Sequence, residues 1–367
     1  WINGKPSGLS GSDVGQVLEM IPAESIEKVE LITNPSAKYS PEGSVGIINL
    51  VLKENRKGGY FGSVSLGANY REGNPYPGGN LGLNFNYSDP KWDVFLNVST
   101  RHNIRHNENY NLRTSWTESG DTTHLNQYNH RKNMFSNVFA RTGFTYHIDS
   151  INDFGISAMG AFGINKSNNQ IIYSHLNQAL DTTQNRVRTT GNEGYMGFYN
   201  VSADYKHIFK KEKEELTANF SYYGGLGEND NSYHNWSKVG ETITENTDYQ
   251  TSKSNYNVFS VQTDYYNKFT KDSKLEVGAK AEYEINNSLD CNYNANKEEI
   301  LDQRNDFRYT EQVYAVYATY GNKWDWFGLQ VGLRAEETLT SANEIKRDYF
   351  QLFPSAYLSF QLPKQNE

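Results

Sequence analysis

The chain has 367 residues, of which 36% are hydrophobic and 14% aromatic, and it carries a formal net charge of -8. No stretch approaches the run of about eighteen apolar residues that marks a membrane-spanning helix, so that class is excluded. The negative charge, with no stripe of lysine and arginine, disfavours a nucleic-acid partner. The single cysteine, Cys291, excludes an intramolecular disulfide and a cysteine metal cluster.

Residues 1–54 are predicted to form a small unit of mixed helix and strand. A short amphipathic helix is expected after Ser12-Asp13 and ends at Pro22. Two strands are expected at about 26–32 and 45–52, separated by a proline-glycine turn. The unit is too small to bury a core alone. Residues 55–59 form a polar, glycine-ended linker to the remainder of the chain.

From Tyr60 onward, apolar and polar residues alternate with a period of two. Successive side chains of a strand point to opposite faces, so each segment has one apolar and one polar face. Many segments run for about 9 to 15 residues, which suits a membrane-crossing strand better than a soluble strand of about five or six. Charged residues in mid-strand, such as Lys280, Glu282 and Arg334, are typical of a wall that lines a wet lumen.

The predicted strands are joined alternately by short and long polar segments, which is typical of outer-membrane barrels. The sequence therefore predicts an all-β transmembrane fold, an antiparallel up-and-down outer-membrane β-barrel with about twelve strands in residues 60–367. The short connections are 88–91, 148–151, 210–214, 270–273 and 322–325, and the predicted loops are 71–79, 105–131, 166–193, 228–255, 287–306 and 340–348.

The stretches from Ile21 to Tyr39 and from Glu42 to Lys53, together with Ile2-Asn3-Gly4, resemble the end of the plug domain of TonB-dependent receptors. The "TNPSAKY" and "G-IIN-VLK" elements are most similar to outer-membrane receptors of Bacteroidetes, as is Leu352-Phe353-Pro354-Ser355. The residues that carry the plug resemblance, to which a structural role is assigned, are Asn3, Gly4, Glu27, Glu30, Asn34, Pro35, Tyr39, Gly43, Gly46 and Asn49.

The resemblance implies that residues 1–54 are the C-terminal part of a plug and residues 60–367 the N-terminal portion of a barrel of about 22 strands. The chain starts at Trp1 with no initiator Met or signal segment, so we expect a fragment of a longer precursor. The implied function is import of a scarce ligand of unknown identity. Many siderophore receptors have "RGP" where this chain has Thr33-Asn34-Pro35. The resemblance therefore does not imply that the imported ligand is a siderophore.

The implied partners are outer-membrane lipid, the imported ligand and a TonB–ExbB–ExbD complex that contacts a segment upstream of this chain. A surface lipoprotein is a further candidate partner. We expect no enzymatic activity, cofactor, metal site or catalytic residue, because no nucleophile elbow or His-Glu-x-x-His motif is present. The ligand-binding residues are left unassigned. A non-transporting surface or adhesion barrel is the alternative function, and an outer-membrane hydrolase is a third.

Three further sets of residues have both a structural and a functional interpretation. Glycines 43–46 and 224–227 are interpreted as a tight turn and as a strand end or close backbone approach, rather than as phosphate or ligand loops. His102 and His106 lie where a strand enters a predicted loop, and metal binding there is disfavoured. Aromatic residues of the predicted loops either stack on a ligand or pack the loops together: Tyr110, Trp116, Tyr128, Tyr233, Trp236 and Tyr249.

Overall fold

The computed structural model describes residues 26–32, 36–40, 47–52, 58–70, 76–116, 120–209 and 214–360. The predicted helix and six of the plug-motif residues lie outside these ranges: Asn3, Gly4, Asn34, Pro35, Gly43 and Gly46. Most of the predicted linker, 55–57, also lies outside them. Within the described residues, no helix has the length and apolar character needed to cross a membrane.

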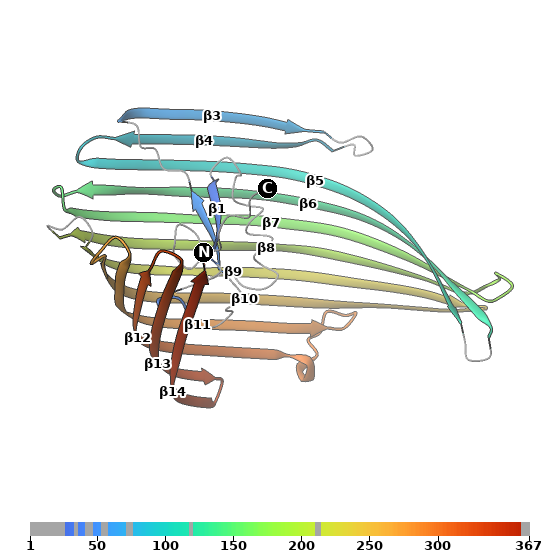
Figure 1. The fold of residues 1–367 in the computed structure, drawn as a ribbon. Coiled ribbons are helices and arrows are strands. Elements are labelled where there is room, and N and C mark those ends of the chain that lie inside the picture. Colours follow the sequence, from blue (N-terminus) through green and yellow to red (C-terminus); the bar gives the residue numbers. More distant parts are fainter. Residues whose placement is uncertain are drawn as a thin grey trace, which may run out of the picture.

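The described strands form two separate antiparallel sheets (Figure 1). The smaller is a hairpin of β1 (Ile26–Ile32) and β2 (Ile47–Leu52). The larger has twelve strands, each hydrogen-bonded to its neighbours in the sequence, with β3 and β14 at its edges. This confirms the predicted fold class and strand number. The twelve strands are β3 (Gly59–Asn69), β4 (Gly78–Ser88), β5 (Trp92–Trp116), β6 (Thr122–His147), β7 (Asn152–Leu176), β8 (Thr182–Ile208), β9 (Glu214–Val239), β10 (Thr242–Asn267), β11 (Ser273–Tyr293), β12 (Asn305–Lys323), β13 (Phe327–Ala342) and β14 (Ile345–Phe360).

The large sheet has an apolar outer face and a mainly polar inner face, where the inner face is the one that contacts the β1–β2 hairpin. On β7, the outward side chains of Phe162 and Ile164 are 45% and 44% exposed, whereas Ala161 on the inner face is buried. Every outward-facing residue of β7 from Phe154 to Ile164 is uncharged, and the first charged one is Lys166. At about 3.3 Å per residue and a tilt of about 40°, this length matches the apolar band of about 25 Å that a barrel presents to lipid.

Aromatic side chains gather beside the short turns, where a barrel meets the membrane interface. Trp92 follows the 89–91 turn, and its ring lies 4.5 Å from that of Tyr146 and 5.6 Å from that of Phe144. At the turn between β12 and β13, Trp324 stacks on Phe327 with 5.4 Å between ring centroids. These contacts support the interpretation of the high aromatic content as an interfacial girdle.

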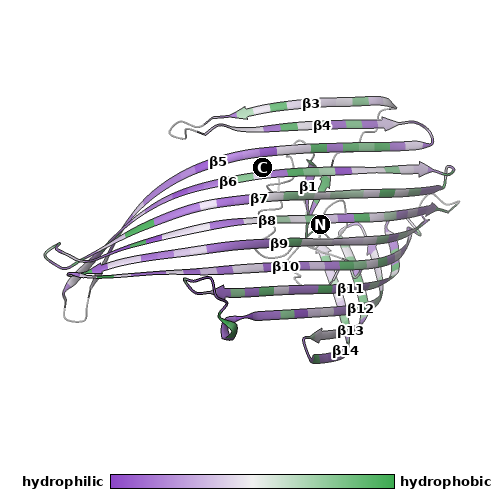
Figure 2. Ribbon diagram, turned by 180° about the vertical axis from the view of Figure 1, so that it is seen from behind, coloured by the Kyte–Doolittle hydropathy of each residue, from purple (hydrophilic) through white to green (hydrophobic). Residues whose placement is uncertain are grey.

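The predicted loops 105–131, 166–193 and 228–255 are wrong for most of their length, because the chain continues there as paired strands. β5 to β10 have 25 to 27 residues each, and the β5–β6 ladder continues without a break from Asn107↔Arg131 to Trp116↔Thr122. Figure 2 shows that the projecting ends of these strands are mostly hydrophilic. Both faces meet water there, so the alternation that marks a strand in the sequence disappears while the backbone hydrogen bonds continue.

The connections at this end are consequently short. A two-residue turn at Gly240-Glu241 joins β9 to β10, and Gly240 has a φ of +57°, which favours glycine. Asn343, with a φ of +50°, occupies the turn between β13 and β14. Between β11 and β12 the predicted loop is partly correct, since residues 294–304 are irregular apart from the short 3-10 helix η2 (Leu301–Gln303). Cys291 is a free thiol, as predicted, but it lies buried in β11.

The glycines at 224–227 lie in the middle of β9, so the strand-end interpretation is wrong and the close-approach interpretation is confirmed. A Cβ atom at Gly224 would lie 2.6 Å from the hydroxyl of Tyr199 and still closer to the carbonyl oxygen of Tyr256. Tyr199 and Tyr222 both donate their hydroxyls to Asn257 Oδ1 on the outer face. The missing side chain at Gly224 therefore leaves room for the Tyr199 ring to cross the strand.

Candidate functional site

The β1–β2 hairpin packs against the inner face of the large sheet. Leu50 of β2 is buried in one hydrophobic cluster with Phe139 of β6, Ala161 of β7 and Phe198 of β8, and Ile26 packs against the same cluster. Phe139 is only 1% exposed. Burying an apolar side chain of this size contributes about 1.5–3 kcal/mol. The hairpin is therefore held by apolar contact to a wall whose other inner-face residues are largely polar.

Two of the plug-motif residues meet across the hairpin. Glu30 and Asn49 are opposite each other in the β1–β2 register, and the Asn49 side-chain amide donates to Glu30 Oε2 at 2.8 Å. Lys28 Nζ lies 2.7 Å from Glu30 Oε1. The hydrogen bond from Lys28, and then that from Asn49, lowers the pKa of the Glu30 carboxyl below its ordinary value. Glu27 is exposed on β1, and Tyr39 lies in the next segment.

Residues 36–40 contact the sheet at a second point. The Ala37 backbone N–H donates to Thr319 Oγ1 of β12 at 3.1 Å, in a buried position. A Cβ atom added at Gly332 of β13 would lie 3.2 Å from the Ala37 Cβ, so glycine allows the two chains to approach. Tyr39 closes this turn through its N–H, which donates to the Ser36 carbonyl at 3.1 Å. The segment before β2 is therefore tied to the wall by both a hydrogen bond and close packing.

The wall beside Gly332 carries paired charges. Arg334 Nε and Glu336 Oε2 are 2.7 Å apart, and both side chains are almost fully buried. On the neighbouring strands, the Tyr317 hydroxyl donates to Asp264 Oδ1 at 2.6 Å, and Lys280 pairs with Glu282 at 2.8 Å. The predicted mid-strand charges thus lie on the inner face, and each is neutralised by a partner on its own strand.

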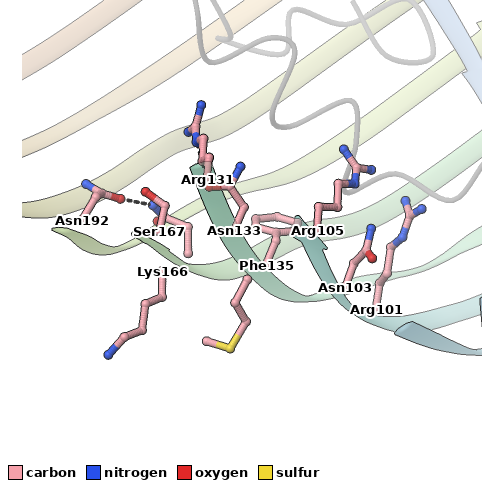
Figure 3. Close-up of a pocket in the computed structure, with 11 residues that line it drawn as sticks. Arg101, Asn103, Arg105, Arg131, Asn133, Phe135, Lys166, Ser167 and Asn192 are labelled. Atoms are coloured by element: carbon pink, nitrogen blue, oxygen red, sulfur yellow. Dashed lines mark hydrogen bonds between the residues drawn. The ribbon is translucent and has the colours of Figure 1, made fainter. Parts of the chain in front are cut away.

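A cationic pocket of about 230 Å³ opens on the inner face of β5 and β6, beyond the apolar band. It is lined by the side chains of Arg101, Arg105 and Arg131, by Phe135, and by a group of asparagines. Figure 3 shows the three arginines directed to one side of the sheet and Lys166 to the other. In the β5–β6 register, Arg105 is opposite Asn133, and Arg131 is two residues further along, so their Cβ atoms are about 7–8 Å apart.

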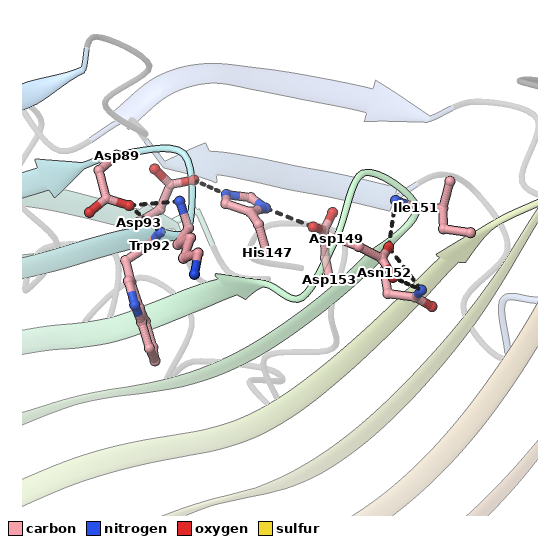
Figure 4. A network of polar contacts seen from close by, with 9 residues as sticks. Asp89, Trp92, Asp93, His147, Asp149, Ile151, Asn152 and Asp153 are labelled. Carbon is pink, nitrogen blue, oxygen red and sulfur yellow. Dashed lines mark hydrogen bonds and ion pairs between the residues drawn. The ribbon is translucent and has the colours of Figure 1, made fainter.

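Polar contacts at the opposite end of these strands hold the short turns (Figure 4). His147 lies between two carboxylates, with Nδ1 2.7 Å from Asp153 Oδ1 and Nε2 3.0 Å from Asp93 Oδ2. In the 148–151 turn, Asp149 accepts the Ile151 N–H at 2.9 Å and the Asn152 side-chain amide at 2.8 Å. These bonds, the first foremost, lower the pKa of the Asp149 carboxyl. The contacts join β5, β6 and β7, which is a structural role.

The remaining sequence candidates are dispersed. His102 contacts Ser136 Oγ at 2.7 Å, and the His106 ring stacks on Tyr76 with 5.4 Å between centroids. Among the residues that the structure describes, no group of three or more His, Cys, Asp or Glu is placed to hold a metal ion. The six aromatic residues assigned to loops lie instead on the projecting strands.

Sequence reasoning missed the cationic pocket. Arg105 and Arg131 fall within the predicted loop 105–131, and no motif in the sequence singles out Arg101. The signal that identifies them is the period of two, because Arg101, Asn103 and Arg105 share one face of a strand once β5 is known to extend to Trp116.

Comparison with known proteins gives one family match. Residues 207–367, which include β9 to β14, match the model of the outer membrane protein beta-barrel family. The twelve-stranded sheet with its apolar outer face agrees with that match. The protein resides in the outer membrane. No curated protein matches the chain.

Several solved outer-membrane proteins resemble the structure at low identity. The siderophore receptor PiuA from Acinetobacter baumannii is 10% identical, with a TM-score of 0.38, over 90% of this chain and 69% of that protein. The ferric yersiniabactin uptake receptor FyuA from Yersinia pestis is 8% identical, with a TM-score of 0.34, over 91% of this chain and 67% of that protein. The outer membrane protease OmpT from Escherichia coli is 9% identical, with a TM-score of 0.26, over 74% of this chain and 96% of that protein. Scores this low carry none of these activities over to the present chain.

Proposed function

We propose that this chain is part of a TonB-dependent receptor that imports a scarce solute across the outer membrane. In this proposal, residues 1–54 are the end of the plug, residues 60–367 are the first part of a barrel of about 22 strands, and TonB with ExbB and ExbD supplies the energy. The observation that carries the proposal is the β1–β2 hairpin, which belongs to neither edge of the large sheet and packs on its inner face through Leu50.

The contacts between the hairpin and the wall are those expected of a plug that is bound at rest and released during transport. Among the described residues, its buried attachment to the wall includes one small apolar cluster and a hydrogen bond from Ala37 to Thr319. Neither is a continuous β-ladder, whereas each pair of neighbouring strands in the large sheet shares a ladder. A mechanical pull on the plug would therefore break the hairpin contacts before the wall opens.

The test compares solute uptake by cells that produce the full-length protein with and without its TonB-contacting segment. Untargeted mass spectrometry of the medium identifies the solutes that the cells deplete, and a protonophore removes the energy source in a parallel culture. The proposal expects depletion that needs both the segment and the proton gradient. Depletion that persists without either of them rejects energy-driven import.

A surface-binding role is the second candidate, and the projecting ends of β5 to β10 favour it. On β5, Tyr110, Leu112 and Trp116 share the outer face of the projection and are 65%, 57% and 74% exposed. Exposed aromatic rows of this kind mark interaction surfaces. Cells that adhere to a surface through the protein, yet deplete no solute, favour this role over import.

A further inference from the structure

The three arginines of the cationic pocket lack acidic partners. Elsewhere on the inner face, Arg334 pairs with Glu336, Lys280 with Glu282 and Lys206 with Glu215. In the described part of the chain, no carboxylate lies within ion-pair distance of the three pocket arginines, and the one hydrogen bond among them runs from Arg131 Nε to Asn133 Oδ1 at 2.9 Å. Arg105 and Arg131 are diagonal neighbours in the β5–β6 ladder, so two unneutralised guanidinium groups lie close together on one face.

The donors of the pocket suit a planar or tetrahedral oxyanion. A guanidinium group offers its N–H donors in a rigid fork that matches a carboxylate or a phosphate. Beside the arginines, the amides of Asn165, Asn192 and Asn231 form a chain across three strands, with donor–acceptor distances of 2.6 and 2.8 Å. The volume of about 230 Å³ admits a small charged group and leaves the body of a larger solute outside.

The pocket also adjoins the hairpin contact. Phe135 lines the pocket, and it packs against the cluster that holds Leu50. In the β5–β6 register, Phe135 is opposite Asn103, between the levels of Arg101 and Arg105. An anion in the pocket would therefore lie one side chain away from the hairpin.

We propose that Arg105 and Arg131 bind the carboxylate or phosphate group of a soluble anionic solute, on the inner face of the wall and next to the hairpin, with Arg101 further along β5 at the edge of the same pocket. A soluble anion is favoured over a lipid phosphate because Figure 3 shows the arginines on the face opposite to Lys166, and lipid contacts the outer face. The identification of this solute as the imported ligand rests on the proposed function. The binding of the anion does not.

The experiment measures binding of citrate and of inorganic phosphate to the full-length protein in detergent by isothermal titration calorimetry, at constant ionic strength. Arg105→Gln and Arg131→Gln each remove one guanidinium group, and Arg105→Lys keeps the charge without the fork. Lys206→Gln, on the same face of the wall but outside the pocket, is the matched control. Heat-modifiable migration on electrophoresis shows that each variant has folded.

We expect the wild type and Lys206→Gln to bind at least one probe, and each arginine-to-glutamine variant to bind it at least about tenfold more weakly, with Arg105→Lys in between. The inference is overturned if neither probe binds, if the arginine-to-glutamine variants bind as the wild type does, or if lipopolysaccharide alone binds. The assay involves no TonB. Arginine-dependent binding without energy-dependent uptake thus rejects the import proposal alone, and the reverse result rejects the anion site alone.

Discussion

Leu50 is the residue on which the attachment of the hairpin depends most. It is 7% exposed in the cluster with Phe139, Ala161 and Phe198, whereas Ile48 on the same strand is 60% exposed. Leu50→Ala leaves a cavity and removes apolar contact, which costs about 2–5 kcal/mol at buried sites. We expect faster hydrogen exchange of the backbone amides in residues 47–52, with unchanged exchange in β6 to β8. Ile48→Ala is the control, and equal exchange in the two variants would contradict the packing.

Glu336 tests whether the buried ion pair holds its strand in place. Glu336→Leu leaves the Arg334 charge buried without its carboxylate, and breaking such a pair costs about 3–5 kcal/mol. The double variant Arg334→Met with Glu336→Leu removes both charges and should recover most of the loss. The temperature at which the heat-modifiable band is lost measures both. A double variant that is less stable than Glu336→Leu alone would show that the pair is not the source of the effect.

At the scale of elements, the short turn between β6 and β7 should respond to acid. The folded-state pKa of Asp149 is depressed below its ordinary value of 3.8, so its ionised form stabilises the turn above that pH and the contribution is lost as pH falls through the folded pKa. Asp149→Asn should therefore unfold at a lower temperature than the wild type at pH 7. The gap should narrow as the pH drops below about 3.8. A gap that is the same at pH 7 and pH 3 would be inconsistent with the assignment.

The projecting strands should be dispensable for the barrel. Asn107 and Arg131 are directly paired in the β5–β6 ladder, so an Asn-Gly turn can replace residues 108–130 and close the hairpin where the apolar band ends. We expect the shortened protein to reach the outer membrane and to keep its heat-modifiable migration. Removal of residues 93–100 and their partners, which lie within the band, is the control and should abolish both. Failure of the first variant to insert would show that the projection takes part in folding.

At the scale of the whole molecule, the sequence predicted the features that lipid imposes. Alternation from Tyr60 onward predicted twelve strands and their two faces, because an apolar face is required wherever the strand meets lipid. It did not predict the projections of β5 to β10, since both faces there are wet and alternation is lost over most of their length. Glu30 and Asn49 were singled out by the resemblance alone, and the hydrogen bond between them was not predicted. The cationic pocket was not predicted, because the alternation did not reveal how far the strands that carry its residues extend.

The central claim is that alternate side chains of this wall meet lipid and a wet interior. On β10, Phe259 and Val261 are on the outer face, and Val258 and Ser260 are on the inner face. The most direct measurement places one spin label at a time at these four positions of the protein in outer-membrane vesicles and compares its collisions with oxygen and with a water-soluble nickel chelate. We predict oxygen-rich, chelate-poor signals at Phe259 and Val261 and oxygen-poor signals at Val258 and Ser260, which are 2% and 4% exposed. Similar accessibilities at all four positions would contradict the account.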